Sequence, residues 1–349
     1  MTASYTNTGQ GDLIMLGIGI LGCGRIGAMH AANIAAHPRA RVAAVYDINV
    51  AAAQAVSRAT GAPVMPSAAE VFAAPDVDAV LIATATDTHA DLLEQAIAAG
   101  KPVLCEKPID LSLARVDSCA AAIAHTTLPV QIGFVRRFDP GHRAVFEAVH
   151  DGTIGDLHQL VITSRDPGLP PEAYLEKSGG ILRDMTIHDF DMARYILGEE
   201  PTRVFAVGSR LVAPALMDAL GDEDTITVVM TTDTGRQAIL INSREATYGY
   251  DQRVEAFGSQ GMAVSENRRP HHMVLSGSTF TEHAAPLLNF FIERYREAFN
   301  AEIDAFVDAV ENGSPVTVSY HDGRQALLLA EAALKSLKEG RIVTTGEIG

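Results

Sequence analysis

The chain has 349 residues, of which 47% are hydrophobic and 20% are charged, and its net charge at pH 7 is −16. This length suits two domains, and the composition is typical of a globular protein. No run of about 18 residues is apolar and free of charge, which argues against a membrane span, and the acidic balance argues against a nucleic-acid partner.

The first predicted elements are an apolar strand, a glycine-rich turn and an alanine-rich helix, in LIMLGIGILGCGRIGAMHAANIAAH from Leu13. The glycines at the junction give the pattern G-x-G-x-x-G. The first permits a tight turn, the second lets the backbone approach a pyrophosphate, and the third lets the helix pack closely on the strand. We assign the whole loop to cofactor binding: Gly22, Cys23, Gly24, Arg25, Ile26 and Gly27.

The second predicted strand, RVAAVYD, ends in Asp47, 20 residues after Gly27. A carboxylate at this place accepts hydrogen bonds from the adenine ribose and repels the 2′-phosphate of NADP. No arginine follows in residues 48–51 to bind that phosphate. The sequence therefore predicts an NAD site that includes Asp47 and Ile48. The alternative is that Asp47 only caps the next helix.

Strands and helices keep alternating up to about residue 135, which indicates a parallel sheet with helices on both faces. Ligands of such sheets lie beyond the carboxyl ends of the strands. Two strand ends carry polar side chains there, ATATDTH and CEKP. We assign five of their residues to cofactor binding: Thr84, Thr86, His89, Glu106 and Lys107.

Lys107 and His89 each have a simpler interpretation as well. A lysine at a strand end often extends along the surface with its ammonium group in water. The position of Lys107, where the nicotinamide end of a bound NAD would lie, favours a functional role instead. His89 stands at the start of a helix, so it is the weaker candidate for a direct role.

After FVRRFDP the pattern changes to consecutive strands: TRVFAVGSR, DTITVVMTT, GRQAILINSRE and QRVEAFGSQG. Strands without intervening helices indicate a mostly antiparallel sheet. We therefore predict an α/β chain, with a doubly wound Rossmann domain over residues 13–135 and an α+β domain with a large open sheet over residues 136–349. An open sheet face needs a cover, so we expect a homo-oligomer built through this sheet. We name a homotetramer as the expected assembly, although the sheet alone does not determine the number of copies.

Cysteine usage bears on the compartment. Cys23, Cys105 and Cys119 form no C-x-x-C pair, and any disulfide would leave one of them over. The first 15 residues are polar and carry no basic side chain, unlike a secretory signal. We expect reduced thiols and a cytoplasmic protein.

One apolar segment, GGILRDMTIHDFDMARYILG, carries a polar stripe. Asp184, His188 and Asp191 are spaced i, i+4 and i+7, which places all three on one face of a single helix. A solvated helix face is one interpretation. A metal site is another, because aspartate and histidine at this spacing can ligate one ion. We expect no metal, since hydride transfer assisted by a lysine already accounts for these groups.

GCGRIG, the strand-end Asp47, ATATDTH, CEKP, FVRRFDP and RDMTIHDFD, in this order, resemble the Gfo/Idh/MocA oxidoreductases from about Leu16 to the C-terminus. The last two motifs are most similar to the myo-inositol 2-dehydrogenase branch. The resemblance implies that Lys107, Asp184 and His188 are catalytic. It also implies a set of substrate-binding residues: Lys107, Arg137 (or its neighbour Arg136), Asp184, His188, Asp191 and Tyr248.

The expected activity is oxidation of a cyclic polyol, with myo-inositol giving 2-keto-myo-inositol (scyllo-inosose) and NAD accepting the hydride. His188 would take the hydroxyl proton, Lys107 would stabilise the developing alkoxide, and Asp184 would hold the imidazole. Three alternatives stay open. They are a dehydrogenase of another inositol isomer or an aldose, a relative that cleaves glycosides with NAD but without net redox change, and an NAD-binding regulator without catalysis.

Overall fold

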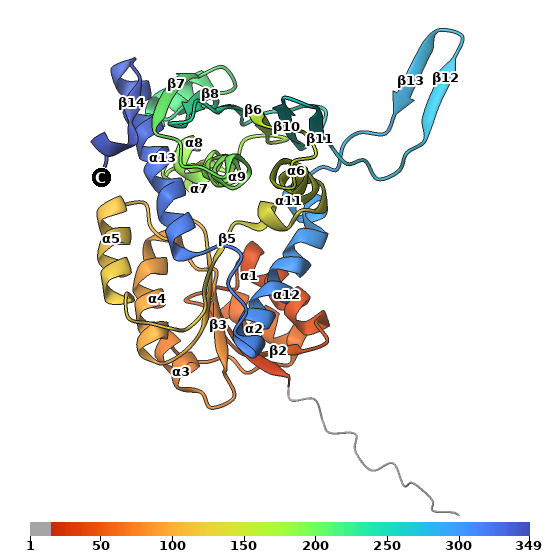
Figure 1. Cartoon of the computed structure of the whole chain (residues 1–349). Helices are drawn as coiled ribbons and strands as arrows, with labels where there is room; N and C mark the ends of the chain where they lie inside the picture. Colours follow the sequence, from red (N-terminus) through yellow and green to blue (C-terminus); the bar gives the residue numbers. More distant parts are fainter. Residues whose placement is uncertain (1–14) are drawn as a thin grey trace, which may run out of the picture.

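The chain forms two sheet-centred units, which the computed structural model describes for residues 15–349 (Figure 1). Residues 13 and 14 of the predicted first domain lie outside this range. The first unit is a five-stranded parallel sheet in the order β2-β1-β3-β4-β5. Its strands are β1 (Leu16–Leu21), β2 (Ala40–Tyr46), β3 (Ala79–Ile82), β4 (Val103–Glu106) and β5 (Val130–Gly133).

Helices follow the strands of this first sheet in alternation, as predicted. They are α1 (Arg25–Ala36), α2 (Val50–Thr60), α3 (Ala68–Ala73), the short η1 (Thr86–Thr88), α4 (His89–Ala98) and α5 (Leu113–Ala122). From β1 the chain first places β2 on one side and then β3 on the other. Ligands of open α/β sheets bind at such a reversal, beyond the carboxyl ends of the strands.

The second unit is a seven-stranded sheet in the order β11-β10-β6-β9-β8-β7-β14. Its strands are β6 (Leu157–Arg165), β7 (Arg203–Ser209), β8 (Thr225–Thr231), β9 (Gln237–Ser243), β10 (Asp251–Gly258), β11 (Met262–Ser265) and β14 (Val343–Thr344). All neighbours are antiparallel except β6 and β9. The parallel first sheet and the mostly antiparallel second sheet confirm the predicted fold class.

Helices cover one face of the second sheet, as Figure 1 shows for α6 (Pro140–His150), α9 (Ile187–Leu197) and α13 (Tyr320–Glu339). Side chains alternate along the strands, so buried residues face these helices and the other face is exposed. Strand pairing brings several exposed apolar side chains together on that outer face: Val207, Val229, Phe257, Met262 and Val264. The open face expected from the sequence is therefore present.

The remaining elements connect the two sheets or extend from them. They are η2 (Val135–Phe138), α7 (Glu172–Leu175), α8 (Ile181–Asp184), α10 (Pro214–Leu220), α11 (Phe291–Arg294), α12 (Arg296–Asn312), η3 (Thr345–Glu347) and a hairpin of β12 (Val274–Gly277) and β13 (Phe280–Ala284). The hairpin projects from the body of the molecule (Figure 1). None of the helices within residues 15–349 combines the length and apolarity needed to cross a bilayer.

Helix α12 returns from the second unit to the first. Its residues Ile303, Phe306 and Val307 share a hydrophobic core with β1 and α1. The domain boundary at residue 135 stays a prediction. This packing shows that the last third of the chain contributes to the core beneath the first sheet.

The segment from Gly179 to Gly198 is two helices rather than the single helix predicted. Helix α8 ends at Asp184 and α9 begins at Ile187. The Thr186 hydroxyl between them donates to the side chain of Asn242 on β9, at 2.9 Å. The expectation of one continuous polar stripe was therefore wrong, because the segment is divided between α8 and α9.

Candidate active site

The glycine-rich loop between β1 and α1 has the backbone geometry that a pyrophosphate requires. Gly22 has a φ of +92°, and a Cβ there would lie 2.3 Å from the carbonyl oxygen of Ala83. A Cβ on Gly27 would lie 1.9 Å from the carbonyl oxygen of Gly22. A Cβ on Gly24 would meet none of the described atoms within 4 Å. The loop is therefore closed on its sheet side and accessible at the start of α1, where phosphate groups bind.

Asp47 lies directly after β2 and holds this loop in place. Its carboxylate accepts hydrogen bonds from the backbone N–H of Cys23 at 2.6 Å and of Asn49 at 2.7 Å. Asn49, not Asp47, caps α2 with its side chain, so the helix-cap alternative does not describe this residue. Ile48 is 91% exposed beside it. The position of Asp47 next to the loop fits the predicted ribose contact.

His89 is buried and connects the two strand-end loops. Its Nδ1 lies 2.8 Å from the carbonyl oxygen of Pro108, and its Nε2 lies 3.1 Å from that of Thr84. Burial lowers the pKa of the imidazole. This arrangement argues against the predicted direct contact of His89 with the cofactor, because both ring nitrogens already face backbone carbonyls. His89 instead fixes the loops that carry Thr84 and Lys107.

Lys107 joins the two units at the carboxyl end of β4. Its ammonium group donates to the backbone carbonyl of Asp184 at 2.8 Å and lies 3.7 Å from the Asp184 carboxylate. The same carboxylate accepts from the Tyr174 hydroxyl at 2.6 Å, and Arg244 lies 3.3 Å away. The side chain of Lys107 is only 17% exposed. The surface-lysine interpretation is therefore wrong, since this lysine reaches inward to a carboxylate.

His188 lies on the first turn of α9 against the edge of the Phe134 ring, with ring centroids 5.8 Å apart. Burial and the charges of Lys107 and Arg136 hold its pKa well below the usual range. The imidazole is therefore neutral at pH 7, and the same surroundings disfavour its protonated form. Its Nδ1 has no hydrogen-bond partner within the described part of the chain.

The predicted pairing of Asp184 with His188 is wrong. In residues 15–349 the polar contacts of the Asp184 side chain are with Lys107, Tyr174 and Arg244. The break between α8 and α9 accounts for this, because the two residues are not on consecutive turns of one helix. Asp184 therefore orients the lysine rather than the histidine.

Sequence reasoning missed three residues of this cluster: Asp166, Tyr174 and Arg244. Asp166 directly follows β6, and burial together with the nearby Asp184 carboxylate raises its pKa to about 6. The motif SRDP contained a usable signal, since the aspartate ends a strand and precedes a proline. Tyr174 and Arg244 come from segments without a comparable pattern.

Arg137 and Asp191, predicted to bind substrate, pair with each other instead. Arg137 donates to both carboxylate oxygens of Asp191, at 2.8 and 2.6 Å, and to Asp322 at 2.9 Å. Asp191 is fully buried, and Arg137 is 6% exposed. Arg136 is also buried and pairs with Asp189 at 2.5 Å. These ion pairs hold the buried side of helix α9 in place.

Tyr248 makes its polar contacts outside the group of side chains around Lys107 and Asp184. Its hydroxyl donates to Asp251 at 2.6 Å and accepts from Arg165 at 2.9 Å, and its side chain is 49% exposed. The structure therefore brings together Lys107, Asp184 and the beginning of α9, and it leaves Tyr248 and the Arg137–Asp191 pair outside that group. Asp184, His188 and Asp191 likewise do not form the alternative metal site, since Asp191 is enclosed by arginine.

A phosphate loop, a carboxylate at the ribose position and an inward-reaching lysine define a dinucleotide-dependent oxidoreductase. Residues 16–134 match the family model described as an oxidoreductase family with an NAD-binding Rossmann fold. Residues 142–264 match the Gfo/Idh/MocA C-terminal domain. The chain belongs to the Gfo/Idh/MocA oxidoreductase family, and its first unit is an NAD-binding Rossmann domain.

Similar proteins of this family cover nearly the whole chain. An inositol 2-dehydrogenase of Rhizobium meliloti (strain 1021) is 48% identical over 93% of this chain and 98% of its own. The crystal structure of a myo-inositol dehydrogenase from Corynebacterium glutamicum ATCC 13032 is 42% identical, with a TM-score of 0.91 over 95% of this chain and 98% of that one. A scyllo-inositol dehydrogenase from Lactobacillus casei, solved with NAD(H) and scyllo-inositol, is 31% identical, with a TM-score of 0.89 over 95% and 99%.

Proposed function

We propose that the chain is an NAD-dependent dehydrogenase that oxidises a ring hydroxyl of inositol, with myo-inositol giving scyllo-inosose as the main reaction. The observation that carries this proposal is the reach of Lys107 from the end of β4 to Asp184 of the second unit, where its charge also acts on the His188 imidazole. The similarity to inositol dehydrogenases over nearly the full length supports the substrate class.

The proposed chemistry assigns a role to each of these side chains. NAD⁺, when bound on the glycine loop, supplies the hydride acceptor. The imidazole of His188, on the first turn of α9, accepts the hydroxyl proton. The ammonium group of Lys107 stabilises negative charge that develops on the oxygen, and Asp184 holds the lysine in that position.

We infer a supporting role for the residues outside this group. Arg137 and Asp191 act by fixing α9, whose first turn carries His188, and not by binding the polyol directly. Asp166 is a proposed additional polar contact for substrate, because its side chain interacts electrostatically with both Lys107 and Asp184. Tyr248 stays a predicted substrate contact.

We also propose that copies of the chain assemble through the open face of the second sheet, as a homotetramer in the cytoplasm. The apolar side chains on that face would be covered by a second copy, and exposed Val274, Leu275 and Phe280 of the projecting hairpin extend the apolar surface. The three cysteines are buried and unpaired in the described residues, which suits a reducing compartment. Light scattering during size-exclusion chromatography tests the assembly; a monomer would contradict it.

Initial rates of NADH formation test the activity. The panel contains myo-, scyllo- and chiro-inositol and glucose, each with NAD⁺ and with NADP⁺. We expect the highest kcat/KM for myo-inositol with NAD⁺. A preference for another isomer or for glucose would change the assigned substrate and leave the assigned reaction, NAD-dependent oxidation, unchanged. Sugar release from glycosides without NADH would replace the proposal by the glycoside-cleaving alternative.

A further inference from the structure

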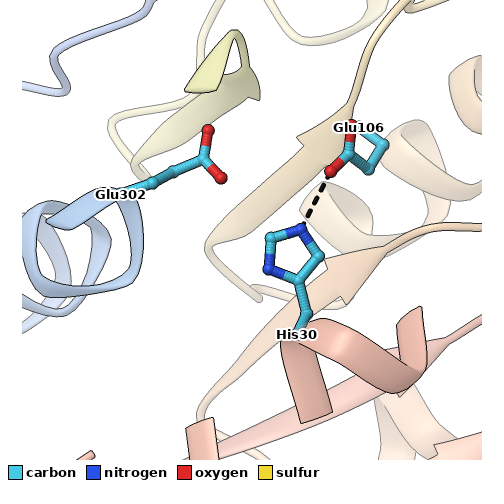
Figure 2. A group of neighbouring side chains, drawn as sticks. All are labelled: His30, Glu106 and Glu302. Carbon is cyan, nitrogen blue, oxygen red and sulfur yellow. Dashed lines mark hydrogen bonds and ion pairs between the residues drawn. The ribbon is translucent and has the colours of Figure 1, made fainter. Parts of the chain in front are cut away.

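Three ionisable side chains, two of them buried and one partly buried, lie close together at the end of β4 (Figure 2). They are His30 on α1, Glu106 at the end of β4 and Glu302 on α12, and one ligating atom from each lies within 4.8 Å of the others. His30 Nε2 is 2.9 Å from Glu106 Oε1. We call these residues the buried triad.

Glu302 is the unusual member of the buried triad. It is fully buried, and both of its carboxylate oxygens lack a hydrogen-bond partner within residues 15–349. Its carboxyl group points toward His30 and Glu106 (Figure 2). Next to it, Ile303 and Phe306 enter the apolar core. A charged carboxylate without a donor or a cation is strongly unfavourable in such surroundings, whereas the neutral acid is not.

The charge of Glu106 adds to this preference. Burial, and secondarily the neighbouring Glu106 carboxylate, raise the pKa of Glu302 well above its usual range. A neutral carboxylic acid carries one O–H donor. The ligating atoms of the triad all lie within 4.8 Å of one another, and one water molecule or a small side-chain rotation closes a distance of this size.

Glu106 links the buried triad to the catalytic region. One of its oxygens binds His30, and the other accepts from the backbone N–H of Lys107 at 3.3 Å. Helix α1, which carries His30, begins at the glycine loop. The triad therefore connects the phosphate-binding helix, the strand end with the lysine, and a helix that returns from the second unit.

We propose that Glu302 is a positioning residue, a neutral acid whose proton is shared with the His30–Glu106 pair and which thereby holds Glu106 against the backbone of Lys107. Glu302 contacts neither substrate nor cofactor, so it acts through Glu106. The inference rests on the proposed role of Lys107. According to this proposal, the buried Glu302 helps to position Lys107 for its contact with the alcohol.

A divalent cation is the competing occupant, because one imidazole and two carboxylates also form a ligand set for zinc or manganese. The direct 2.9 Å contact between His30 and Glu106 favours proton sharing, since the two groups already face each other. The side chain of glutamine distinguishes the two cases. It reproduces the neutral donor and acceptor of a carboxylic acid, and it is a poor replacement for an anionic metal ligand.

The test compares Glu302→Gln and Glu302→Leu in the full-length enzyme, with Phe306→Leu as a matched control on the same helix. We measure kcat, KM for myo-inositol, the Kd of NAD⁺, the thermal midpoint and the metal content. Glu302→Gln should keep kcat within about twofold, and Glu302→Leu should lose about ten- to hundredfold, as misplacement of a reacting group does. Phe306→Leu should lower the thermal midpoint and leave kcat unchanged, because it only opens a cavity.

Three results would overturn the proposal: a Glu302→Gln variant as impaired as Glu302→Leu, a Glu302→Leu variant no more impaired in kcat than Phe306→Leu, or a stoichiometric divalent metal removed by chelator with loss of stability. Failure of the proposed function is detected separately. If Lys107→Met keeps the wild-type rate, the role of the lysine is lost. In that case the thermal midpoints still test the protonation of Glu302. A midpoint that stays unchanged in Glu302→Gln and falls in Glu302→Leu would support a neutral acid at this position.

Discussion

Two ion pairs near α9 each join a basic side chain to an aspartate, but they differ in how deeply they are buried. Lys107 and Asp184 lie 3.7 Å apart, with 17% and 12% of their side chains exposed. Arg137 and Asp191 form two short hydrogen bonds and are almost completely buried. The carboxylate of the first pair is shared with a tyrosine and an arginine, and its lysine stays partly exposed. The comparison fits the proposal that the partly exposed pair serves chemistry and the enclosed pair serves stability.

Loss of His188 or Lys107 should give the largest effect on the accessible side of this comparison. His188→Ala removes the proton acceptor, so kcat should fall by about 10²–10⁴-fold, and Lys107→Met should behave similarly. The Kd of NAD⁺ should change little, because the glycine loop is untouched. Steady-state kinetics and a binding titration measure both quantities. Wild-type turnover in either variant would mean that the substituted residue is not part of the catalytic site.

Arg137→Met should affect the enclosed pair mainly through stability. It leaves the carboxylate of Asp191 buried without its principal partner, which costs about 3–5 kcal/mol of unfolding free energy. Denaturant unfolding measures this loss. The double variant Arg137→Met/Asp191→Leu is the matched control and should recover part of it. A stable single variant with a raised KM for inositol would instead support direct substrate binding by Arg137.

Asp47→Ser should change the choice of nucleotide by a smaller amount. Loss of a charged hydrogen-bond acceptor is worth about 1.5–3 kcal/mol, so the ratio of kcat/KM for NAD⁺ over NADP⁺ should fall about ten- to hundredfold. The serine also loses the contact with the backbone of Cys23. An unchanged ratio would mean that Asp47 only shapes the loop.

Asp166→Asn should give the smallest effect, on the pH dependence of stability. The pKa of Asp166 is raised to about 6 by burial and by Asp184, whereas an unfolded aspartate titrates at about 3.9. The folded state therefore holds its proton longer, and this group's contribution to stability declines as the pH rises from about 4 to about 6. The asparagine variant should lack that decline and be the more stable of the two proteins above pH 6. Parallel unfolding curves of both proteins across this range would contradict the assignment.

Local sequence patterns were sufficient for the first sheet and the cofactor loop. Gly22, Gly27 and Asp47 act within a few residues of one strand-to-helix junction, so their spacing alone predicts the arrangement. The strand-rich second unit was also predicted from a local pattern, because consecutive strand-like runs follow one another there without intervening helices.

Interactions between distant segments account for what the sequence did not reveal. Thr186, between α8 and α9, contacts Asn242 of β9, and no local pattern around residue 186 predicts that contact. The partner of Asp191 is an arginine from η2, which the i, i+7 spacing cannot indicate. An amphipathic pattern shows that α12 has an apolar face, but it does not show that this face belongs to the core of the first unit.

The most direct test of the central claim is transfer of deuterium from myo-inositol labelled at C2. The product nucleotide is analysed by mass spectrometry after turnover with NAD⁺. Hydride transfer from C2, with Lys107 and His188 acting on its hydroxyl, predicts one deuterium in each NADH and slower turnover than with unlabelled inositol. NADH without deuterium, or no NADH at all, would contradict oxidation at that carbon.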